Sequence, residues 1–285
     1  MNVSSRNIIA RISHNRHNLT ATENEIANYI IDHPTETAEK TITVLSKNIG
    51  VSEASINRFC KKIGYNGFND FKIAVAQDSY YRKMQDKKRA ASSMNLSETL
   101  AFDYTELINI TSENINQDLL KELAEQIPSA KNIYIIAFSE AHSVATHLYY
   151  QLLMLSIPSI VVNDLNLLNI IVNKCNEDDL FIVITETGNN KELNRLIEKA
   201  KQNRSSLFIL TSYESSKLSS LSTNKLVIPN RLSINQASII SSYISYIFVI
   251  DAVIGILIKS DIKYVREKLE NEGIITSNDY HNYDY

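Results

Sequence analysis

Polar and basic side chains recur along one side of a predicted helix over residues 53–63, and their types suit the reading of nucleic acid. Ile56, Phe59, Cys60 and Ile63 form an apolar stripe on this helix, and Ser52 precedes it as a good N-cap. Arginine and lysine pair with guanine edges, asparagine with adenine, and serine with bases or phosphates, so the opposite side fits the major groove of double-stranded DNA. The solvated side of an ordinary amphipathic helix is the alternative. The candidate DNA contacts are Ser52, Glu53, Ser55, Asn57, Arg58, Lys61 and Lys62.

The elements that would position this helix precede it in the chain. Thr20 and Glu23 have the spacing of a capping box, and the helix that they begin is expected to end at His33-Pro34. A second, short helix is predicted over residues 43–48, and Gly50-Val51 forms the turn that follows it. A short helix, a glycine-containing turn and an N-capped second helix are typical of a helix-turn-helix motif.

The segment 19–77 resembles the N-terminal domain of RpiR/MurR-family regulators. The resemblance is carried by VSEASI at residues 51–56 and RFCKKIGYNGF at residues 58–68, together with the capping box. It implies that a sugar isomerase (SIS) domain follows, and the strand–helix order of residues 110–258 agrees with one. It further implies a homo-oligomeric regulator, expected to be a homodimer, that binds an operator in sugar catabolism genes and responds to a phosphorylated sugar.

Beyond residue 110 the sequence alternates between apolar strand-like runs and helical patterns. This alternation indicates a parallel sheet covered on both faces, so a three-layer α/β domain is expected after the all-α helix-turn-helix domain. The predicted strands are 132–138, 159–162, 180–185, 206–211 and 225–228, and the predicted helices are 140–155, 165–173, 190–202, 215–221 and 237–258. The predicted domains are the helix-turn-helix domain at 1–77, a linker and lead-in helix at 78–109, the SIS domain at 110–260 and a C-terminal tail at 261–285, frayed from Asn271 onward.

In such a fold, ligands bind beyond the carboxyl ends of the strands. The resemblance places a phosphate there, on loops rich in hydroxyl groups and at helix N-termini, where backbone N–H groups and Ser or Thr hydroxyls donate. The candidate ligand-binding residues carried over from the family in this way are Thr185, Thr187, Gly188, Asn190, Thr211 and Ser212.

The sequence departs from the family's pattern around this site. The first loop reads AFSEA at residues 137–141 where family members have Gly-x-Gly-x-Ser, so side chains replace two glycines and Glu140 would repel a phosphate. Glu186 adds a negative charge in the next loop, and a Ser-Arg pair near the last helix is Ser242-Tyr243 here. The sequence therefore leaves three possibilities open: a phosphosugar, a changed ligand and no ligand.

Composition favours a cytoplasmic protein, and its charge asymmetry leaves two equal alternatives for the N-terminal part: a polyanionic partner and ordinary surface variation. Residues 1–90 carry 14 Lys/Arg against 9 Asp/Glu, a net charge of +5, whereas residues 91–285 carry 15 against 23, a net charge of −8. No run approaches the roughly 18 apolar residues of a membrane span, and the N-terminus lacks the pattern of a secretory signal, so no membrane partner is expected. Cys60 and Cys175 lie far apart, which argues against a disulfide framework or a zinc site. We expect neither a metal nor a cofactor.

A phosphosugar isomerase or lyase of the SIS fold is the alternative to a regulator. Isomerisation requires a positioned base, commonly His or Glu. Of the 6 histidines only His142 and His147 lie in the α/β region, and neither belongs to a recognisable catalytic constellation. A helix-turn-helix domain has no role in that reaction, so the sequence favours a non-enzymatic regulator and predicts no catalytic residue.

Overall fold

The structure is a computed structural model in which the chain forms two compact units. The first unit comprises Met1–Asn114 and Pro229–Ser241, and the second comprises Ile115–Ile228 and Ser242–Tyr285. The residues that the structure describes are 8, 12, 15, 16, 19–76, 78, 79, 95–214, 216–234 and 238–281, with 276–281 described by their backbone alone. Most of the predicted linker therefore lies outside the described residues.

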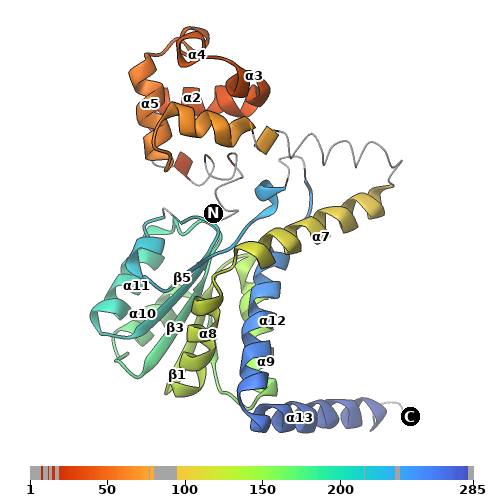
Figure 1. Ribbon diagram of the computed structural model, residues 1–285. Coiled ribbons are helices and arrows are strands. Elements are labelled where there is room, and N and C mark those ends of the chain that lie inside the picture. Colours follow the sequence, from red (N-terminus) through yellow and green to blue (C-terminus); the bar gives the residue numbers. More distant parts are fainter. Residues whose placement is uncertain are drawn as a thin grey trace. The chain divides into compact units, whose positions relative to one another are not determined.

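The first unit is helical, as the sequence predicted. Its helices are α2 (Ala21–Asp32), α3 (Pro34–Glu39), α4 (Ile42–Ile49), α5 (Glu53–Lys62) and α7 (Leu96–Asn114), and residues 68–76 are also helical (Figure 1). The predicted capping box is present: the Thr20 N–H donates to Glu23 Oε2 (2.8 Å) and the Glu23 N–H to Thr20 Oγ1 (3.3 Å). His33 ends α2, and Pro34 occupies the first turn of α3, where its missing N–H is not needed.

One apolar cluster holds α2, α4, α5 and the helical residues 68–76 together. Phe59 of α5 is fully buried, and its ring meets Phe71 edge to face at a centroid distance of 6.3 Å. The other buried apolar members of the cluster are Ile8, Ile12, Ile26, Ala27, Ile30, Leu45, Ile56, Cys60, Ile63, Tyr65, Phe68 and Val75. α2, α4 and α5 all contribute to this cluster. The buried side of α5 therefore determines which of its residues face outward.

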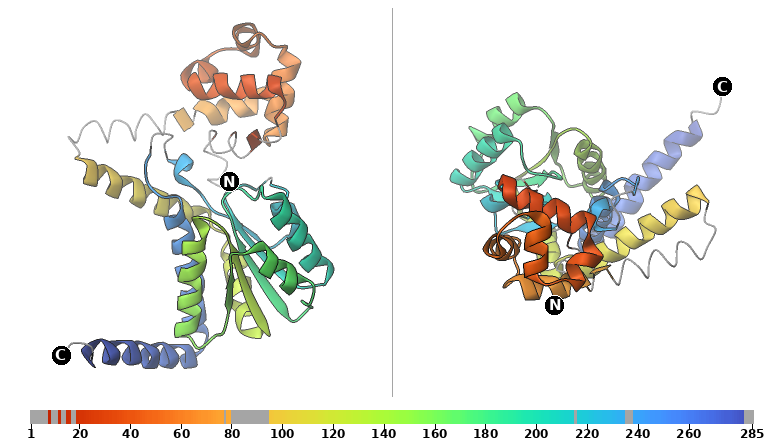
Figure 2. Two further views of the ribbon diagram at one scale, coloured as in Figure 1. Left: turned by 180° about the vertical axis from the view of Figure 1, so that it is seen from behind. Right: turned by 90° about the horizontal axis from the view of Figure 1, so that it is seen from above.

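The second unit is built on a five-stranded parallel sheet of order β2-β1-β3-β4-β5. The strands are β1 (Asn132–Ala137), β2 (Ile160–Val162), β3 (Asp179–Ile184), β4 (Ser206–Thr211) and β5 (Lys225–Val227). The central strand β3 is buried along its whole length, because helices cover both faces of the sheet (Figure 2). The predicted three-layer α/β architecture is confirmed.

Two separate apolar cores lie on the two faces of the sheet. The first core includes side chains of α8 (Gln117–Gln126), α9 (Ala141–Met154) and α12 (Tyr243–Ser260). The second core includes those of α10 (Leu165–Val172) and α11 (Lys191–Gln202). By length and composition α12 is apolar enough to cross a membrane, but residues such as Tyr246 and Val253 on its inner side belong to the first core. This helix therefore has the packing of a core helix.

Three predictions about helices were wrong. Residues 215–221 do not form an α-helix: only a 3-10 turn exists at Ser219–Leu221, where Ser216 Oγ accepts from the Ser219 N–H (3.1 Å), and residue 215 lies outside the described residues. The last core helix begins at Tyr243 rather than at residue 237, which itself lies outside the described residues. The preceding segment belongs to the first unit instead, where Ser238 Oγ donates to Asp103 Oδ2 (2.7 Å).

The third wrong prediction concerns the C-terminus. Residues predicted as a tail, frayed from Asn271, form helix α13 (Ile262–His281), and 282–285 lie outside the described residues. Tyr264 is buried against the first core, and Asn271 Nδ2 donates to Met154 O (3.1 Å). Tertiary contacts therefore order a segment whose polarity alone suggested a loose end.

Candidate functional site

The helix-turn-helix of the first unit is fixed by caps at each end of its turn. Gly50 ends α4 with φ = +81°, a left-handed conformation that glycine adopts without strain. Two residues later Ser52 caps α5, because its Oγ accepts from the Ser55 N–H (3.1 Å). α5 therefore starts at the residue that the sequence predicted, and its rotation about its own axis is set by the buried Ile56 and Phe59.

The outer side of α5 presents most of the candidate DNA contacts together. A chain of polar contacts runs along it: Ser52 Oγ lies 2.8 Å from Ser55 Oγ, which also accepts from Arg58 Nη2 (3.2 Å). Arg58 and Lys61 are exposed, and Ser55 is partly buried at the base of the arginine. The guanidinium group is thereby held beside the helix N-terminus, where the recognition helices of helix-turn-helix proteins contact base edges.

Two of the predicted DNA contacts have other partners. Asn57 is exposed, but its Oδ1 accepts from the Phe68 N–H (2.9 Å), which fastens the segment after α5 to that helix. Lys62 Nζ donates to Glu23 Oε2 (2.7 Å) and joins α5 to α2. Burial by itself would raise the pKa of Glu23, but hydrogen bonds from Lys62 and Thr20 outweigh it and lower that pKa below 4.5. These contacts hold α5 in position against α2 and the segment that follows α5.

A second candidate site follows from the strand order of the second unit. β2 lies on one side of β1 in the sheet, and β3 lies on the other side. The loop after β1 therefore leads toward β2 and the loop after β3 toward β4, in opposite directions, so β1 and β3 form a topological switch point. Ligands in open α/β sheets bind in the crevice at such a point. The loops concerned contain Ser139-Glu140 and 185–190, which include four of the six candidate ligand residues.

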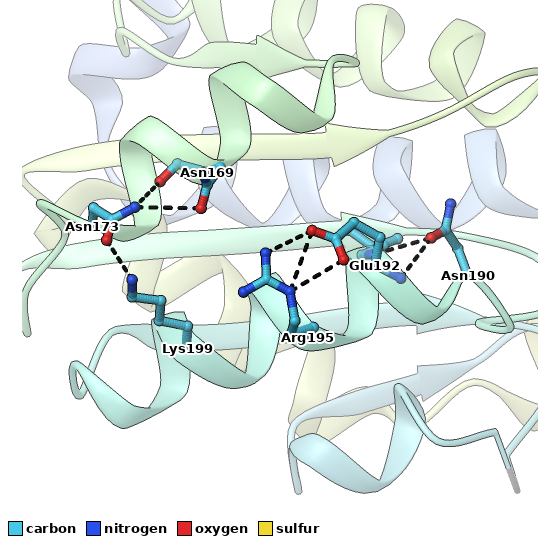
Figure 3. A network of polar contacts seen from close by, with 7 residues as sticks. Asn169, Asn173, Asn190, Glu192, Arg195 and Lys199 are labelled. Atoms are coloured by element: carbon cyan, nitrogen blue, oxygen red, sulfur yellow. Dashed lines mark hydrogen bonds and ion pairs between the residues drawn. The ribbon is translucent and has the colours of Figure 1, made fainter.

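Internal hydrogen bonds shape the loop after β3. Thr185 Oγ1 accepts from the Gly188 N–H (3.2 Å), and Asn194 Nδ2 donates to Gly188 O (3.0 Å). Gly188 has φ = +63°, and a Cβ at this position would lie 2.5 Å from Ser216 Oγ, so only glycine fits. Asn190 caps α11, its Oδ1 accepting from the Glu192 N–H (3.1 Å) and the Leu193 N–H (3.0 Å; Figure 3). In the same view, Arg195 forms an ion pair with Glu192, and Lys199 Nζ donates to Asn173 Oδ1.

Thr211 and Ser212 are fully buried rather than exposed at the end of β4. Thr211 Oγ1 donates to Glu186 O (3.0 Å), and Ser212 Oγ lies 2.9 Å from the hydroxyl of Tyr246. The Tyr246 hydroxyl in turn donates to Thr185 O (3.3 Å). These two candidates hold the loop after β3 in place, whereas Thr187 is exposed on that loop.

The electrostatic environment of the switch point is acidic. Tyr243, at the start of α12, has its pKa raised to about 12 by burial and by the negative charges of Glu186 and Glu140. Both carboxylates therefore lie near the place where the sequence expected them to oppose a phosphate. Ser139 adopts φ = +53°, a conformation that favours glycine, so the first loop keeps a glycine-type backbone while carrying a side chain.

Some residues important to these sites carry no distinctive sequence signal. The hydrogen bond between Asn57 and Phe68 joins residues 11 positions apart, and the one between Tyr246 and Thr185 joins residues 61 positions apart. Asn48 Nδ2 similarly donates to the Tyr29 hydroxyl (3.1 Å) and to Glu36 Oε1 (2.8 Å), tying α4 to α2 and α3. A Cβ added at Gly67 would lie 3.1 Å from Asn57 Oδ1, so the glycine leaves room for the contact between Asn57 and the Phe68 N–H.

Comparisons with known proteins agree with both halves of the structure. Residues 6–81 match the model of the rpiR-family helix-turn-helix domain, and residues 126–255 match that of the SIS domain. An uncharacterized HTH-type transcriptional regulator of Clostridium perfringens is 28% identical over 272 residues, 92% of this chain and 95% of the relative. The HTH-type transcriptional regulator HexR of Escherichia coli is 23% identical over 210 residues, 72% of each chain.

Solved structures show the same fold. The Vibrio vulnificus NanR protein complexed with ManNAc-6P superposes with a TM-score of 0.61 at 23% identity, covering 95% of this chain and 98% of NanR. The sugar isomerase domain of an RpiR transcription factor from Sphaerobacter thermophilus superposes with a TM-score of 0.56 at 16% identity, covering 63% and 99%. The chain therefore belongs to the RpiR family of HTH-type transcriptional regulators, with an rpiR helix-turn-helix domain followed by a SIS domain.

Proposed function

We propose that this transcriptional regulator acts in the bacterial cytoplasm as a homodimer that binds an operator in genes of carbohydrate metabolism. The observation that carries the proposal is α5, a helix capped by Ser52 whose buried side fixes Arg58 and Lys61 on the exposed side. A dimer follows from the motif, because helix-turn-helix proteins commonly read two half-sites about 34 Å apart through a two-fold axis.

The contacts on DNA follow from the chemistry of each side chain. Arg58 is the candidate for a guanine edge, since its guanidinium can donate two hydrogen bonds to O6 and N7. Lys61, Ser52 and Ser55 are candidates for phosphates near the helix N-terminus, and Glu53 for an adjacent cytosine amine. Asn57 and Lys62, which have partners within the domain, are proposed to act through the position of α5.

We further propose that a phosphosugar bound at the switch point modulates DNA binding. Support comes from the exposed Thr187 on the loop before α11 and from the helix N-terminus that follows, which favours an anion. The NanR structure of similar fold contains a phosphosugar, ManNAc-6P. Glu140 and Glu186 oppose the phosphate, and Thr185, Thr211 and Ser212 have internal partners, so we expect modest affinity.

A regulator without enzymatic activity is favoured over an isomerase or lyase. The relatives reported above are named transcriptional regulators. His147 Nε2 lies 2.7 Å from Asp251 Oδ1 on the pair of helices α9 and α12, not on the loops of the switch point. Among the described residues there is also no group of three His, Cys, Asp or Glu side chains that could hold a metal ion. Incubation with phosphosugars should therefore give no isomerised product.

Genome-wide mapping of bound DNA, followed by binding assays on the sites found, tests the proposed DNA contacts. The double variant Arg58→Ala, Lys61→Ala should lose specific binding, whereas Arg195→Ala, Lys201→Ala, which removes the same two charges from α11, should keep it. Unchanged operator affinity in the first variant would place the reading surface elsewhere.

Calorimetry with a panel of sugar phosphates, alongside operator-binding assays, tests the effector. We expect weak binding that Thr187→Val abolishes without changing operator affinity in the absence of ligand. Thr223→Val, at another exposed threonine of the second unit, is the matched control. If no sugar phosphate binds below millimolar concentration and none alters operator affinity, the SIS domain serves another ligand or only assembly.

A further inference from the structure

An Asn-Gly pair, Asn66-Gly67, lies between α5 and the helical residues 68–76, and the sequence contains no other such pair. The backbone nitrogen of the next residue can attack an asparagine side chain, and glycine at that place leaves the attack unhindered because it has no Cβ. Asn66 is exposed and Gly67 is partly exposed, so water reaches both. The pair therefore has the residue types and the exposure that spontaneous deamidation requires.

Hydrogen bonds hold the side chain of Asn66 toward the residues that follow it. The Asn66 N–H donates to Asp70 Oδ2 (3.0 Å), and Asn66 Nδ2 donates to the same oxygen (3.1 Å). Because Asp70 lies in the first turn of the helix that follows, the carboxamide is kept on the side of Asn66 where the Gly67 nitrogen lies. Within the part of the chain that the structure describes, the Gly67 N–H donates no hydrogen bond, so none has to break before its nitrogen attacks.

We propose that Asn66 is a modification site, at which the chain deamidates spontaneously and thereby weakens its own DNA-reading domain. The Gly67 nitrogen attacks Asn66 Cγ, so that a new C–N bond forms and the bond from Cγ to Nδ2 breaks. The proton of the Gly67 N–H passes through water to the leaving nitrogen, which departs as ammonia. Water then opens the cyclic imide at either of its carbonyls and leaves aspartate or isoaspartate in place of Asn66.

Both products disturb contacts that position α5. Each lacks the Nδ2 donor and brings a new carboxylate near Asp70 Oδ2, where like charges repel. Isoaspartate also adds a methylene to the backbone shortly before the Phe68 N–H, which donates to Asn57 Oδ1 of α5 (2.9 Å). Deamidation should therefore loosen the segment that fastens α5, and operator binding should fall as the modified fraction grows.

Mass spectrometry of the full-length chain, aged at mildly alkaline pH, tests the modification. Cleavage after Lys62 and Lys72 releases residues 63–72 as one peptide, which contains both Asn66 and Asn69. Asn69 is exposed as well but is followed by Asp70, so it is an internal matched control. We expect conversion of the amide to an acid at Asn66, with isoaspartate among the products, and none at Asn69. Equal conversion at the two positions, or none at Asn66 by the time that the free peptide 63–72 has converted, would overturn the proposal.

Two variants test the consequence for the domain without ageing. Asn66→Asp carries one product directly and should speed amide hydrogen exchange of residues 66–71 by about 2- to 12-fold, the effect of one lost hydrogen bond. Asn66→Asp, Asp70→Asn exchanges the donor and the acceptor and should return the exchange rate toward that of the wild type. Wild-type exchange in Asn66→Asp alone would refute the weakening.

Aged and fresh preparations are then compared for operator binding. The aged wild-type chain should lose affinity in proportion to its modified fraction, whereas aged Asn66→Gln, whose extra methylene slows ring closure, should keep it. Full affinity in a fully modified chain would contradict the proposal. If Asn66 converts but the fresh chain binds no operator, the proposed function fails while the modification stands; if the fresh chain binds an operator and Asn66 stays intact, the modification fails while the function stands.

Discussion

Arg58 and Lys62 lie four residues apart on α5 but have different contacts, so we expect them to have different roles, and a pair of alanine variants tests this. Arg58 is exposed and held by Ser55, so Arg58→Ala removes a group available to DNA and no contact to the core. We expect its loss to reduce operator affinity by about 1–3 kcal/mol, or about 5- to 150-fold, and to change the unfolding free energy by less than about 0.5 kcal/mol.

Lys62→Ala should have the opposite profile. Its ion pair with Glu23 is 2.7 Å long, and the side chains are 35% and 15% exposed. A pair at this depth contributes about 0.5–1 kcal/mol to folding, after allowance for solvent screening of the lysine. The ratio of operator affinity to non-specific affinity should stay at the wild-type value, because the lysine head is engaged with α2.

Two measurements on the same preparations decide between these expectations. Fluorescence anisotropy with operator and scrambled duplexes at a fixed salt concentration gives the specificity ratio, which is interpretable only when salt is held constant. Amide hydrogen exchange of α2 and α5 gives the local stability. A Lys62→Ala variant that loses specificity while keeping wild-type exchange would show that the lysine reads DNA, and would refute the assignment made from its contact with Glu23.

Three further changes test other parts of the structure. Asn57→Ala leaves the Phe68 N–H without its acceptor and should lower the unfolding free energy of the first unit by about 1 kcal/mol, whereas Asn57→Asp keeps an acceptor and should lose less in denaturant titrations. Glu23 has a pKa below 4.5 in the fold, so its contribution is complete above that pH and is lost as the pH falls through the folded pKa; Glu23→Gln should remove this pH dependence of the melting temperature, and an unchanged acid limb would contradict it. Gly188→Ala forces a side chain into φ = +63° and against Ser216, and should cost at least about 1 kcal/mol in the second unit, while a neutral result would mean that the loop relaxes freely.

The parts of the fold that the sequence predicted are those governed by local rules. The capping box at Thr20 and Glu23, the left-handed Gly50 and the N-cap at Ser52 each involve residues within four positions of their partners, so their spacing is visible in the sequence. The buried strands were predicted because continuous apolar runs such as residues 180–184 have few alternatives in an α/β domain.

What the sequence did not reveal depends on contacts between distant residues. Lys62 and Asn57 have the side chains of DNA-reading residues, but their partners are 39 and 11 positions away, and no local pattern marks such a pairing. Thr211 and Ser212 have hydroxyls that could meet a ligand, yet they are buried under the loop before α11. The ordering of α13 likewise depends on contacts with Met154 and Ser156, which lie more than a hundred residues earlier.

The hydroxyl of Tyr246 couples the loop after β3 to the core helix α12. Burial raises its pKa well above 10, so the phenol stays neutral at physiological pH and its hydrogen bonds to Ser212 and Thr185 do not depend on small changes in pH. Separating the loop from α12 would strand a buried hydroxyl, at a cost of about 1–3 kcal/mol. A ligand bound weakly at the proposed site would supply little energy for that separation, so any displacement of residues 185–188 would be expected to carry α12 with it, and α12 leads directly into α13. Tyr246→Phe would remove the hydrogen bonds to Ser212 and Thr185, so residues 185–188 could then move without α12.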